Sequence, residues 1–445
     1  MKIGILGVGY VGLVTGVCLA EIGHTVKCYD IDSSKIYMLN DGKSPIYEKD
    51  LVKYMRKNKD RLIYTSNEQE AFKNLDIIFI AVGTPELDNG MPDLSHIYNA
   101  CETIKNNINK DCLVVIKSTV PVGTALEIQE YFCKNSTFNI EVVSNPEFLS
   151  QGTAIQNTLY ATRIIIGSNN IKAINTMKTL YKPLLEYPYK VPFLVVSQNS
   201  AEMIKYSSND FLALKLSYIN EIANLCKEVD ADIEEVKEGM KYDSRIGGEY
   251  LNAGIGFGGS CLPKDTKALY QIGKLELVNS TINVNKNQNI LLFNELLKDF
   301  NNNISNKRIG VLGLTFKPGT DDVRYSPAIK NIELLLKEGA IVNAYDPVGI
   351  SNFKKHMTHN NLLYFTNIIE AIKDCDAIII VTDWPEIKNL PIPNIIKNMK
   401  TPRIYDGRNC FSLHDIKQYR VYYSSIGRRT IDNINNIHKI EKESD

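Results

Sequence analysis

The sequence predicts an α/β protein with two doubly wound parallel-sheet domains, joined by a long central helix and a helical dimerisation region. In the first third of the chain, short runs of β-branched residues alternate with helical stretches, and the same alternation restarts near residue 307. Strands that alternate with helices in this way form parallel sheets that helices cover. The chain between the two blocks, about 198–300, has a helical pattern and no convincing strand.

Length and composition exclude several classes of protein. The chain has 445 residues, 44% of them hydrophobic, and 51 basic side chains balance 51 acidic ones. At roughly 150 residues per domain this length predicts three domains, which we place at 1–197, 198–300 and 301–445. A formal net charge of zero argues against nucleic acid or an anionic membrane as a partner. No apolar run approaches the roughly 20 residues of a membrane span. Nine cysteines without a CxxC pair indicate reduced thiols, so we expect a cytoplasmic protein.

Each element follows from a local pattern. The first block has predicted strands at Lys2–Leu6, Thr25–Tyr29, Asp76–Val82, Cys112–Lys117 and Ile140–Ser144. The central helix, from about 201 to 229, carries a near-heptad apolar seam that suits a subunit or domain interface, made of Phe211, Leu214, Tyr218, Ile222, Leu225 and Val229. The Asn-rich segment 301–306 is the linker to the second block. That block has predicted strands at Lys307–Leu312, Ala340–Tyr345, Ala377–Thr382 and Arg403–Tyr405.

The first predicted strand leads directly into a G-x-G-x-x-G motif, Gly7-Val8-Gly9-Tyr10-Val11-Gly12, which opens a predicted helix. Gly7 permits a tight turn, Gly9 lets the backbone approach a pyrophosphate, and Gly12 lets helix and strand pack closely. The second strand ends at Asp30, where a carboxylate accepts hydrogen bonds from ribose hydroxyls and repels a 2′-phosphate. These features predict a Rossmann-like domain that binds NAD rather than NADP. A glycine turn without a ligand is the alternative.

The second block keeps the strand and the glycine turn, in Gly310-Val311-Leu312-Gly313, but lacks the full motif. Its second strand ends at Asp346. This second Rossmann-like block allows two interpretations. The turn is a structural relic, or it holds a different nucleotide with side chains such as Lys317.

Cys261 is the one cysteine whose surroundings suit chemistry. It follows the glycine-dense segment 256–259 and precedes Pro263, which favours a first helical turn. A thiol at the start of a helix, beside Lys264 and near Asp265, has a stabilised thiolate and room for a substrate. A structural cysteine that caps a turn is the alternative. Together with NAD, a nucleophilic thiol indicates four-electron oxidation of an alcohol to an acid, because a thiolate converts the intermediate aldehyde into a thiohemiacetal that can give up a second hydride.

Long ordered blocks of the chain resemble the nucleotide-sugar 6-dehydrogenases, the UDP-glucose/GDP-mannose dehydrogenase family, nearly from end to end. The blocks are GVGYVG at 7–12, STVPVGT at 118–124, NPEFL at 145–149, AEMIKYSSNDFLALKLSYINE at 201–221, GFGGSCLPKD at 256–265, GLTFKPGTDDVRYSPA at 313–328 and DGRN at 406–409. The resemblance implies an N-terminal NAD domain, a central helix that forms a homodimer, and a C-terminal domain that holds UDP. It further implies oxidation of UDP-glucose to UDP-glucuronate with two NAD per turnover.

The resemblance also assigns chemical roles. Cys261 matches the nucleophile, and Lys205 and Asn209 match the pair that holds the developing oxyanion. Side chains at i and i+4 share one helix face, so an ammonium and an amide there can converge on one oxygen. A solvated polar face is the alternative for such a pair. The residues that position or activate water are matched by Asp265, Thr119 and Glu147.

Further matches concern binding. The implied substrate contacts are Glu147, Phe148, Leu149, Lys205, Asn209, Arg245, Tyr250, Gly254, Phe257, Gly258, Lys317 and Arg408. Among these, Arg245 matches an arginine that reaches the active site of the partner subunit. The implied NAD contacts, besides the glycine motif and Asp30, are Lys35, Thr84, Thr119, Lys264 and Arg324. Each basic residue taken alone would be interpreted as a surface charge.

One position departs from the family pattern. Many relatives carry a second acid where this chain has Gln151. Glutamine cannot act as a base, so we assign the activation of water to Glu147 and Asp265. His356 and His359 suggest a metal pair, but no third ligand follows at a suitable spacing, so we expect no metal site. GDP-mannose and UDP-N-acetylmannosamine are the alternative substrates, and a non-catalytic nucleotide-binding regulator is the alternative of another class.

Overall fold

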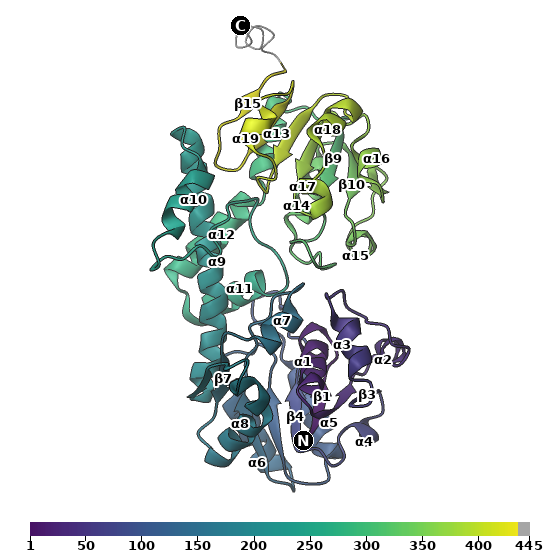
Figure 1. Cartoon of the computed structure of the whole chain (residues 1–445), viewed down its shortest axis with the longest axis vertical. Coiled ribbons are helices and arrows are strands. Elements are labelled where there is room, and N and C mark those ends of the chain that lie inside the picture. The colour runs from purple at the N-terminus through teal and green to yellow at the C-terminus, as the bar shows by residue number, and fades with distance from the viewer. Residues whose placement is uncertain (435–445) are drawn as a thin grey trace. The chain divides into compact units, whose positions relative to one another are not determined.

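The computed structural model describes residues 1–434, which divide into two compact units, Met1–Ser208 and the residues from Asn209 onward. Each unit contains one sheet with helices packed against it (Figure 1). The end of the third predicted domain, residues 435–445, lies outside the described residues. No helix among the described residues has the length and apolar character needed to cross a membrane.

The first unit contains an eight-stranded sheet with the order β3-β2-β1-β4-β5-β6-β7-β8. Its neighbours pair in parallel, except β6 and β7, which pair antiparallel. The strand order reverses between β1 and β4, and ligands of such sheets bind outside the carboxyl ends of the strands at that point. The strands are β1 Lys2–Leu6, β2 Thr25–Tyr29, β3 Leu62–Thr65, β4 Ile77–Ile80, β5 Cys112–Ile116, β6 Ile140–Ser144, β7 Ile164–Gly167 and β8 Phe193–Val196.

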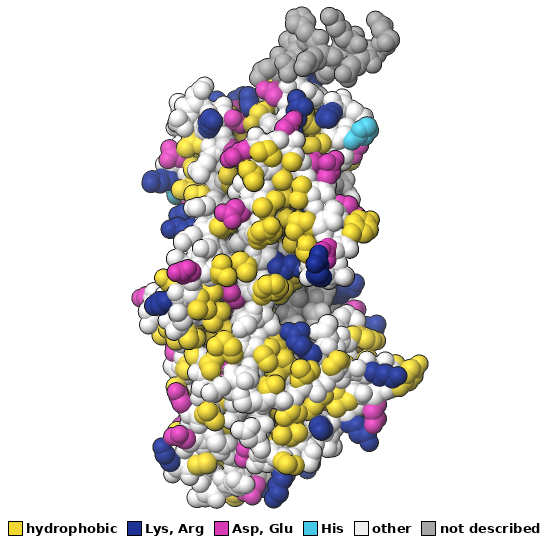
Figure 2. Space-filling view, turned by 90° about the vertical axis from the view of Figure 1, so that its left-hand side faces the viewer, with side chains coloured by type: hydrophobic (Ala, Val, Ile, Leu, Met, Phe, Trp, Pro, Cys, Tyr) yellow, Lys and Arg dark blue, Asp and Glu magenta, His cyan; other side chains and the backbone are white. Residues whose placement is uncertain are grey.

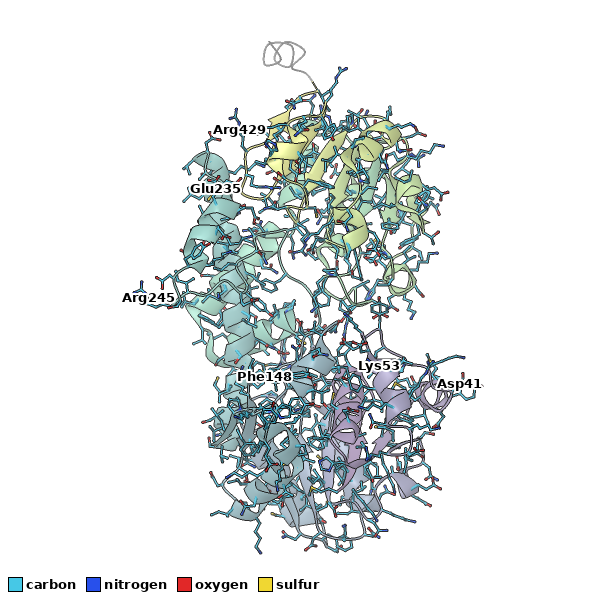
Figure 3. The ribbon with its side chains drawn as sticks, viewed as in Figure 1. Asp41, Lys53, Phe148, Glu235, Arg245 and Arg429 are labelled. Atoms are coloured by element: carbon cyan, nitrogen blue, oxygen red, sulfur yellow. The ribbon has the colours of Figure 1, made fainter. Side chains whose placement is uncertain are left out.

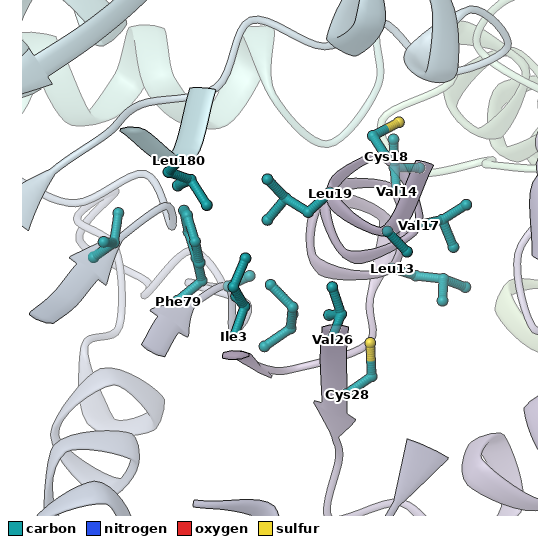
Figure 4. Packing of buried hydrophobic residues seen from close by; sticks show 14 of the residues in the cluster. Ile3, Leu13, Val14, Val17, Cys18, Leu19, Val26, Cys28, Phe79 and Leu180 are labelled. Carbon is teal, nitrogen blue, oxygen red and sulfur yellow. The ribbon is translucent and has the colours of Figure 1, made fainter. Parts of the chain in front are cut away.

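The helices of the first unit pack on this sheet and complete its core. They are α1 Tyr10–Glu21, α2 Ser33–Asn40, α3 Leu51–Lys57, α4 Glu68–Ala71, α5 Ser95–Asn107, α6 Thr124–Asn135, α7 Ala154–Leu159 and α8 Ile171–Leu185. Figure 4 shows residues of α1 beside Ile3 of β1 and Val26 of β2, with Phe79 of β4 and Leu180 of α8 nearby. A Cβ at Gly16 of α1 would lie 2.9 Å from Cys28 Sγ, so this helix packs very close to the sheet.

The second unit contains a seven-stranded sheet with the order β11-β10-β9-β12-β13-β14-β15 in the described residues. Its first six strands repeat the order of the first sheet in parallel, and β15 pairs antiparallel with β14. The strands are β9 Arg308–Leu312, β10 Ile341–Tyr345, β11 Leu362–Phe365, β12 Ala377–Ile380, β13 Arg403–Asp406, β14 Tyr422–Ser425 and β15 Ile431–Asp432.

A 31-residue helix, α9 (Gln198–Glu228), begins in the first unit and continues into the second. The other helices of the second unit are α10 Ile233–Lys241, α11 Leu262–Gly273, α12 Glu276–Gln288, α13 Leu291–Asp299, α14 Pro327–Lys337, α15 Ile350–His356, α16 Ile368–Ile372, α17 Pro385–Lys388, α18 Ile392–Asn398 and α19 Leu413–Ile416. The predicted fold class is confirmed: two doubly wound sheets with a long helix between them in the sequence, and a helical stretch before β9.

The second glycine turn is closed by its own chain. Asp346 follows β10 and accepts hydrogen bonds from the backbone N–H groups of Leu314 (2.7 Å) and Gly349 (2.7 Å), and from Trp384 Nε1 (3.1 Å). A Cβ at Gly313 would lie 2.4 Å from the Cβ of Thr382. The buried Asp346 carboxylate therefore stabilises the turn. For this residue, the structural interpretation applies rather than the nucleotide-binding one.

Candidate active site

The glycine motif forms the turn between β1 and α1, and its three glycines differ in their surroundings. Gly7 has a φ of +96°, and a Cβ there would lie 2.8 Å from the Ala81 carbonyl oxygen. A Cβ at Gly12 would lie 1.8 Å from the Gly7 oxygen. At Gly9, by contrast, a Cβ would meet no described atom within 4 Å. The first and third glycines are therefore required by the fold, whereas Gly9 leaves the backbone open where an anion can approach the start of α1.

Asp30 lies at the end of β2 and holds this turn. Its carboxylate accepts hydrogen bonds from the Val8 N–H (2.8 Å) and the Asp32 N–H (3.0 Å), and Lys35 Nζ lies 3.5 Å away. Thr84 and Thr119 follow β4 and β5, and the Thr84 hydroxyl donates to the Thr119 carbonyl oxygen at 3.0 Å. The first unit thus brings the glycine motif, Asp30, Thr84 and Thr119 to the carboxyl ends of its strands, whereas the predicted cofactor residues Lys264 and Arg324 belong to the second unit. The open glycine turn beside an acid suits an NAD ribose and pyrophosphate.

Glu147 follows β6 and forms a buried ion pair with Lys205 of α9. Its Oε1 accepts a hydrogen bond from Lys205 Nζ at 2.8 Å, and its Oε2 accepts one from the Leu149 N–H. Burial opposes ionisation of Glu147, but the Lys205 charge and these hydrogen bonds outweigh it and hold the pKa below its ordinary value. Phe148 lies between two cations, with the Arg163 guanidinium 3.9 Å from its ring centre and Lys205 Nζ at 5.5 Å. Glu147 is therefore an ionised, positioned carboxylate.

In the second unit, Cys261 is the N-cap of α11, and its side chain is exposed. Pro263 lies in the first helical turn, as the sequence predicts. The first turn also contains Asp265, which is 1% exposed and accepts hydrogen bonds from Asn209 Nδ2 (2.7 Å) and Lys264 Nζ (2.6 Å). The Lys264 ammonium donates to Asp265, and the Arg324 guanidinium, which pairs with Asp322, interacts electrostatically with Cys261.

The glycine-dense loop before Cys261 is held by three polar side chains that the sequence analysis missed. Asn285 accepts from the Phe257 N–H (2.8 Å) and donates to the Phe257 carbonyl (3.0 Å). Asn220 accepts from the Gly254 N–H, and Gln288 donates to the Gly254 carbonyl, both at 2.8 Å. The sequence does contain a pattern that could have identified two of them, because Asn285 and Gln288 lie three residues apart and therefore on one face of α12.

The remaining predicted substrate residues have diverse settings. Arg408 donates from Nε to the Val381 carbonyl (2.7 Å) and from Nη2 to the Phe316 carbonyl (3.3 Å), beside the Gly254 loop. Lys317 Nζ lies 5.6 Å from the Phe316 ring centre, and Tyr250 has a φ of +61°. Arg245 pairs with Asp243, and 88% of its side chain is exposed; Figure 3 shows it pointing outward. No group of three metal-binding side chains occurs within residues 1–434, and the His356–His359 region forms none.

Glu202 is a further residue that the sequence analysis missed. It lies on α9, three residues before Lys205, and accepts hydrogen bonds from the N–H groups of Gly123 (2.7 Å) and Ala125 (2.9 Å) at the start of α6. Its carboxylate therefore fixes the loop that contains Thr119 to the helix that contains Lys205. Burial raises the pKa of Glu202 to about 6, against the opposing effect of the two backbone donors.

Two nucleotide-binding sheets, a glycine turn suited to NAD and an exposed thiol at a helix start define the class of nucleotide-dependent dehydrogenases. Models of three domains of one family match the chain: the NAD binding domain at 1–185, the central domain at 199–297 and the UDP binding domain at 310–413. The chain belongs to the UDP-glucose/GDP-mannose dehydrogenase family. Its first unit contains the NAD-binding domain, and its cofactor is NAD.

Curated relatives and solved structures agree with this assignment. The UDP-glucose 6-dehydrogenase YwqF of Bacillus subtilis is 44% identical over 97% of this chain and 98% of its own length. The UDP-glucose 6-dehydrogenase of Rickettsia typhi is 42% identical over 96% of this chain and all of its own length. A solved UDP-glucose dehydrogenase from Pyrobaculum islandicum is 32% identical, with a TM-score of 0.87 over 96% of this chain and 98% of that one.

We predict that substitutions at two glycines of the motif have different effects: one weakens NAD binding and the other lowers the stability of the fold. Gly9→Ala leaves the unfolding temperature unchanged but raises the dissociation constant for NAD about tenfold or more, roughly 1.4 kcal/mol, because the added methyl group meets only the ligand. Gly12→Ala lowers the unfolding temperature, because its Cβ would overlap the Gly7 oxygen. Titration calorimetry and thermal unfolding measure the two effects. Gly239→Ala, at a helical glycine with open space around it, is the control. Wild-type NAD affinity in Gly9→Ala would contradict the assignment.

We predict that Glu202 makes stability depend on pH in a defined direction. Its carboxyl pKa rises from 4.5 to about 6 on folding. The protonated form therefore stabilises the fold below pH 4.5, and this contribution is lost as the pH rises through 6. Between these values the wild type loses about 2 kcal/mol of unfolding free energy relative to Glu202→Gln, at about 1.4 kcal/mol per pH unit. Urea denaturation of both proteins across this range measures the difference, and a difference independent of pH would contradict it.

Proposed function

We propose that the protein oxidises UDP-glucose to UDP-glucuronate with two NAD per turnover, through a thiohemiacetal and a thioester on Cys261. The observation that carries the proposal is the exposed Cys261 thiol at the N-cap of α11, with Asp265 in the next turn held by Asn209. The relatives named UDP-glucose 6-dehydrogenase, 44% and 42% identical along nearly the whole chain, support this choice of substrate.

The chemistry proceeds in three steps. Bound NAD serves as the hydride acceptor in both oxidations. The primary alcohol first loses a hydride and a proton to become an aldehyde. The Cys261 thiolate then adds to the aldehyde carbon, and the resulting thiohemiacetal loses the second hydride to become a thioester. Water finally adds to the thioester carbonyl, the carbon–sulfur bond breaks, and the acid and the thiolate are released.

We assign roles to the side chains around these steps. Lys205 and Asn209 stabilise the oxyanion, since an ammonium and an amide one turn apart on α9 both offer donors. Glu147, held ionised by Lys205, accepts a proton from the attacking water. Asp265 and Thr119 position water. Because Gln151 cannot serve as a base, no step is assigned to it.

The binding roles proposed for the other residues follow the family. Phe148, Leu149, Tyr250, Gly254, Phe257, Gly258, Lys317 and Arg408 contact the UDP-sugar, as do Glu147, Lys205 and Asn209. Lys35, Thr84, Thr119, Lys264 and Arg324 contact NAD, together with the glycine motif and Asp30. We further propose three working parts, 1–197 for NAD, 198–300 for dimerisation and catalysis and 301–445 for UDP-sugar, in a cytoplasmic enzyme.

An exposed apolar stripe on α9 supports a homodimer. Phe211, Tyr218 and Leu225, spaced by seven residues, are 60%, 49% and 51% exposed, and Val229 is 64% exposed. Figure 2 shows hydrophobic side chains gathered on the face that includes α9. A heptad stripe of this kind packs against a copy of itself across a two-fold axis. We propose that the dimer covers this stripe and that Arg245 then reaches the active site of the partner subunit.

Purified protein offered NAD with UDP-glucose, GDP-mannose or UDP-N-acetylmannosamine in turn should form NADH only with UDP-glucose, at two NADH per UDP-glucuronate. Absorbance at the NADH band and chromatography of the product measure this ratio. Turnover of GDP-mannose alone would replace the substrate assignment. No NADH from any of the three would favour the non-catalytic regulator.

Cys261→Ala should stop acid formation and leave the affinity for NAD at the wild-type value, because the alanine removes only the nucleophile. Titration calorimetry with NAD and product analysis measure the two properties. Cys133→Ala, at the other exposed cysteine of the described residues, is the matched control. Wild-type acid formation in Cys261→Ala would eliminate the thioester mechanism.

Phe211→Glu with Leu225→Glu should convert the dimer to monomers. A two-fold axis places each of the two charges in the interface twice, so four side chains are affected, and a summed loss of about 4 kcal/mol, or about 1 kcal/mol for each, already weakens association roughly 1,000-fold. Sedimentation velocity at several concentrations measures the change. Leu363→Glu, at an exposed apolar residue of β11 in the same unit, is the control. A double variant that sediments like the wild type would refute the α9 interface.

A further inference from the structure

A cavity of about 110 Å³ lies in the first unit behind the Glu147–Lys205 pair. Lys117, Asn145 and Glu147 line it at the ends of β5 and β6, and α1 contributes Thr15 and Cys18. Figure 4 shows Cys18 on the side of α1 turned away from Val26, and Cys18 both belongs to the core of this unit and lines the cavity at its edge. It therefore borders Glu147 from within the NAD-binding unit.

The cavity combines polar groups that call for a polar occupant. Thr15 is 3% exposed, and its Oγ1 has no hydrogen-bond partner among residues 1–434. Lys117 Nζ donates to Asn145 Oδ1 at 3.2 Å, and that oxygen also accepts from the Tyr181 hydroxyl at 2.6 Å. Lys117 has three N–H donors, so it can bind further acceptors. A cavity of this volume holds several water molecules, and these polar groups supply the partners that buried water requires.

The same cavity extends to the surface of the unit. Its lining includes Tyr160, which is 61% exposed, and the exposed Thr162 between α7 and β7. Lys117 retains accessible surface although burial lowers its pKa to about 8. A route for water therefore runs from the α7–β7 connection to the carboxylate of Glu147.

We propose that this cavity is a water-binding site that supplies the molecule consumed in thioester hydrolysis, with Thr15 and Lys117 as positioning residues that hold water behind Glu147. The inference rests on the proposed function. The water oxygen bonds to the thioester carbonyl carbon, one water proton passes to the Glu147 carboxylate, and the Cys261 thiolate leaves with the electrons of the carbon–sulfur bond. The proton on Glu147 then passes to water in the cavity, which exchanges with solvent. Water reaches the base without release of the bound nucleotide sugar.

The test uses Thr15→Val, which removes the hydroxyl at nearly constant volume. Rapid-quench single turnovers with NAD and UDP-glucose follow NADH, the acyl group on Cys261 and the acid. The rates of both hydride steps are expected to stay at the wild-type values, while hydrolysis of the acyl group slows about tenfold, the effect of roughly one lost hydrogen bond. Thr179→Val is the matched control, because Thr179 is an exposed residue of α8 whose hydroxyl donates within its own helix, to the Asn175 carbonyl.

Cys18→Met provides a second variant. The longer methionine side chain occupies part of the cavity, while Glu147 itself keeps its carboxylate. Slow hydrolysis with accumulated acyl-Cys261 in both variants supports the proposal. Wild-type hydrolysis in both variants overturns it, and so does a raised KM for UDP-glucose with unchanged hydrolysis, which would make the cavity part of the sugar site. Failure of the proposed function is distinguishable, because the wild type would then form neither NADH nor an acyl group on Cys261.

Discussion

The buried ion pair between Glu147 and Lys205 is the interaction that positions the candidate site residues of the first unit. Both side chains are at most 5% exposed, and loss of one partner of such a pair costs about 3–5 kcal/mol. The pair fixes the loop after β6 to α9, and Glu202 on the same helix fixes the loop after β5. A single turn of one helix therefore holds the ends of two neighbouring strands, because Glu202 and Lys205 are three residues apart on α9.

The two sheets share a strand order but use the acid at the end of the second strand differently. Asp30 holds the turn through Val8 and leaves Gly9 open beside it, whereas Asp346 is enclosed by Trp384 and by the turn around Gly313. The same carboxylate position thus supports an open anion site in one unit and a closed structural turn in the other. In this chain the difference leaves space for an anion at the glycine turn of the first unit, whereas side chains of the second unit fill the corresponding space.

The sequence predicts those features of the fold that depend on residues close together in the chain. The glycine motif, Asp30 and the helix start at Cys261 were found because each needs specific residues at fixed spacing. Strands such as β3 and β8 were missed because each has only four residues, most of them half-exposed or exposed, and so short a run has no period that separates strand from loop. Lys117, Glu202 and Asn285 were missed for a different reason: their partners lie 28 to 79 residues away, and only the folded chain brings them together.

Exposure alone does not select the reactive cysteine, because Cys133 and Cys261 are both exposed. Cys133 lies in the last turn of α6, and its sulfur accepts a hydrogen bond from Gln129. Cys261 lies at the opposite end of its helix, where unpaired N–H groups and the Arg324 charge favour the thiolate. Burial raises the pKa of Cys18, Cys28 and Cys101 to about 12. Burial therefore sets the buried thiols apart from the two exposed ones, and position along a helix then distinguishes Cys261 from Cys133.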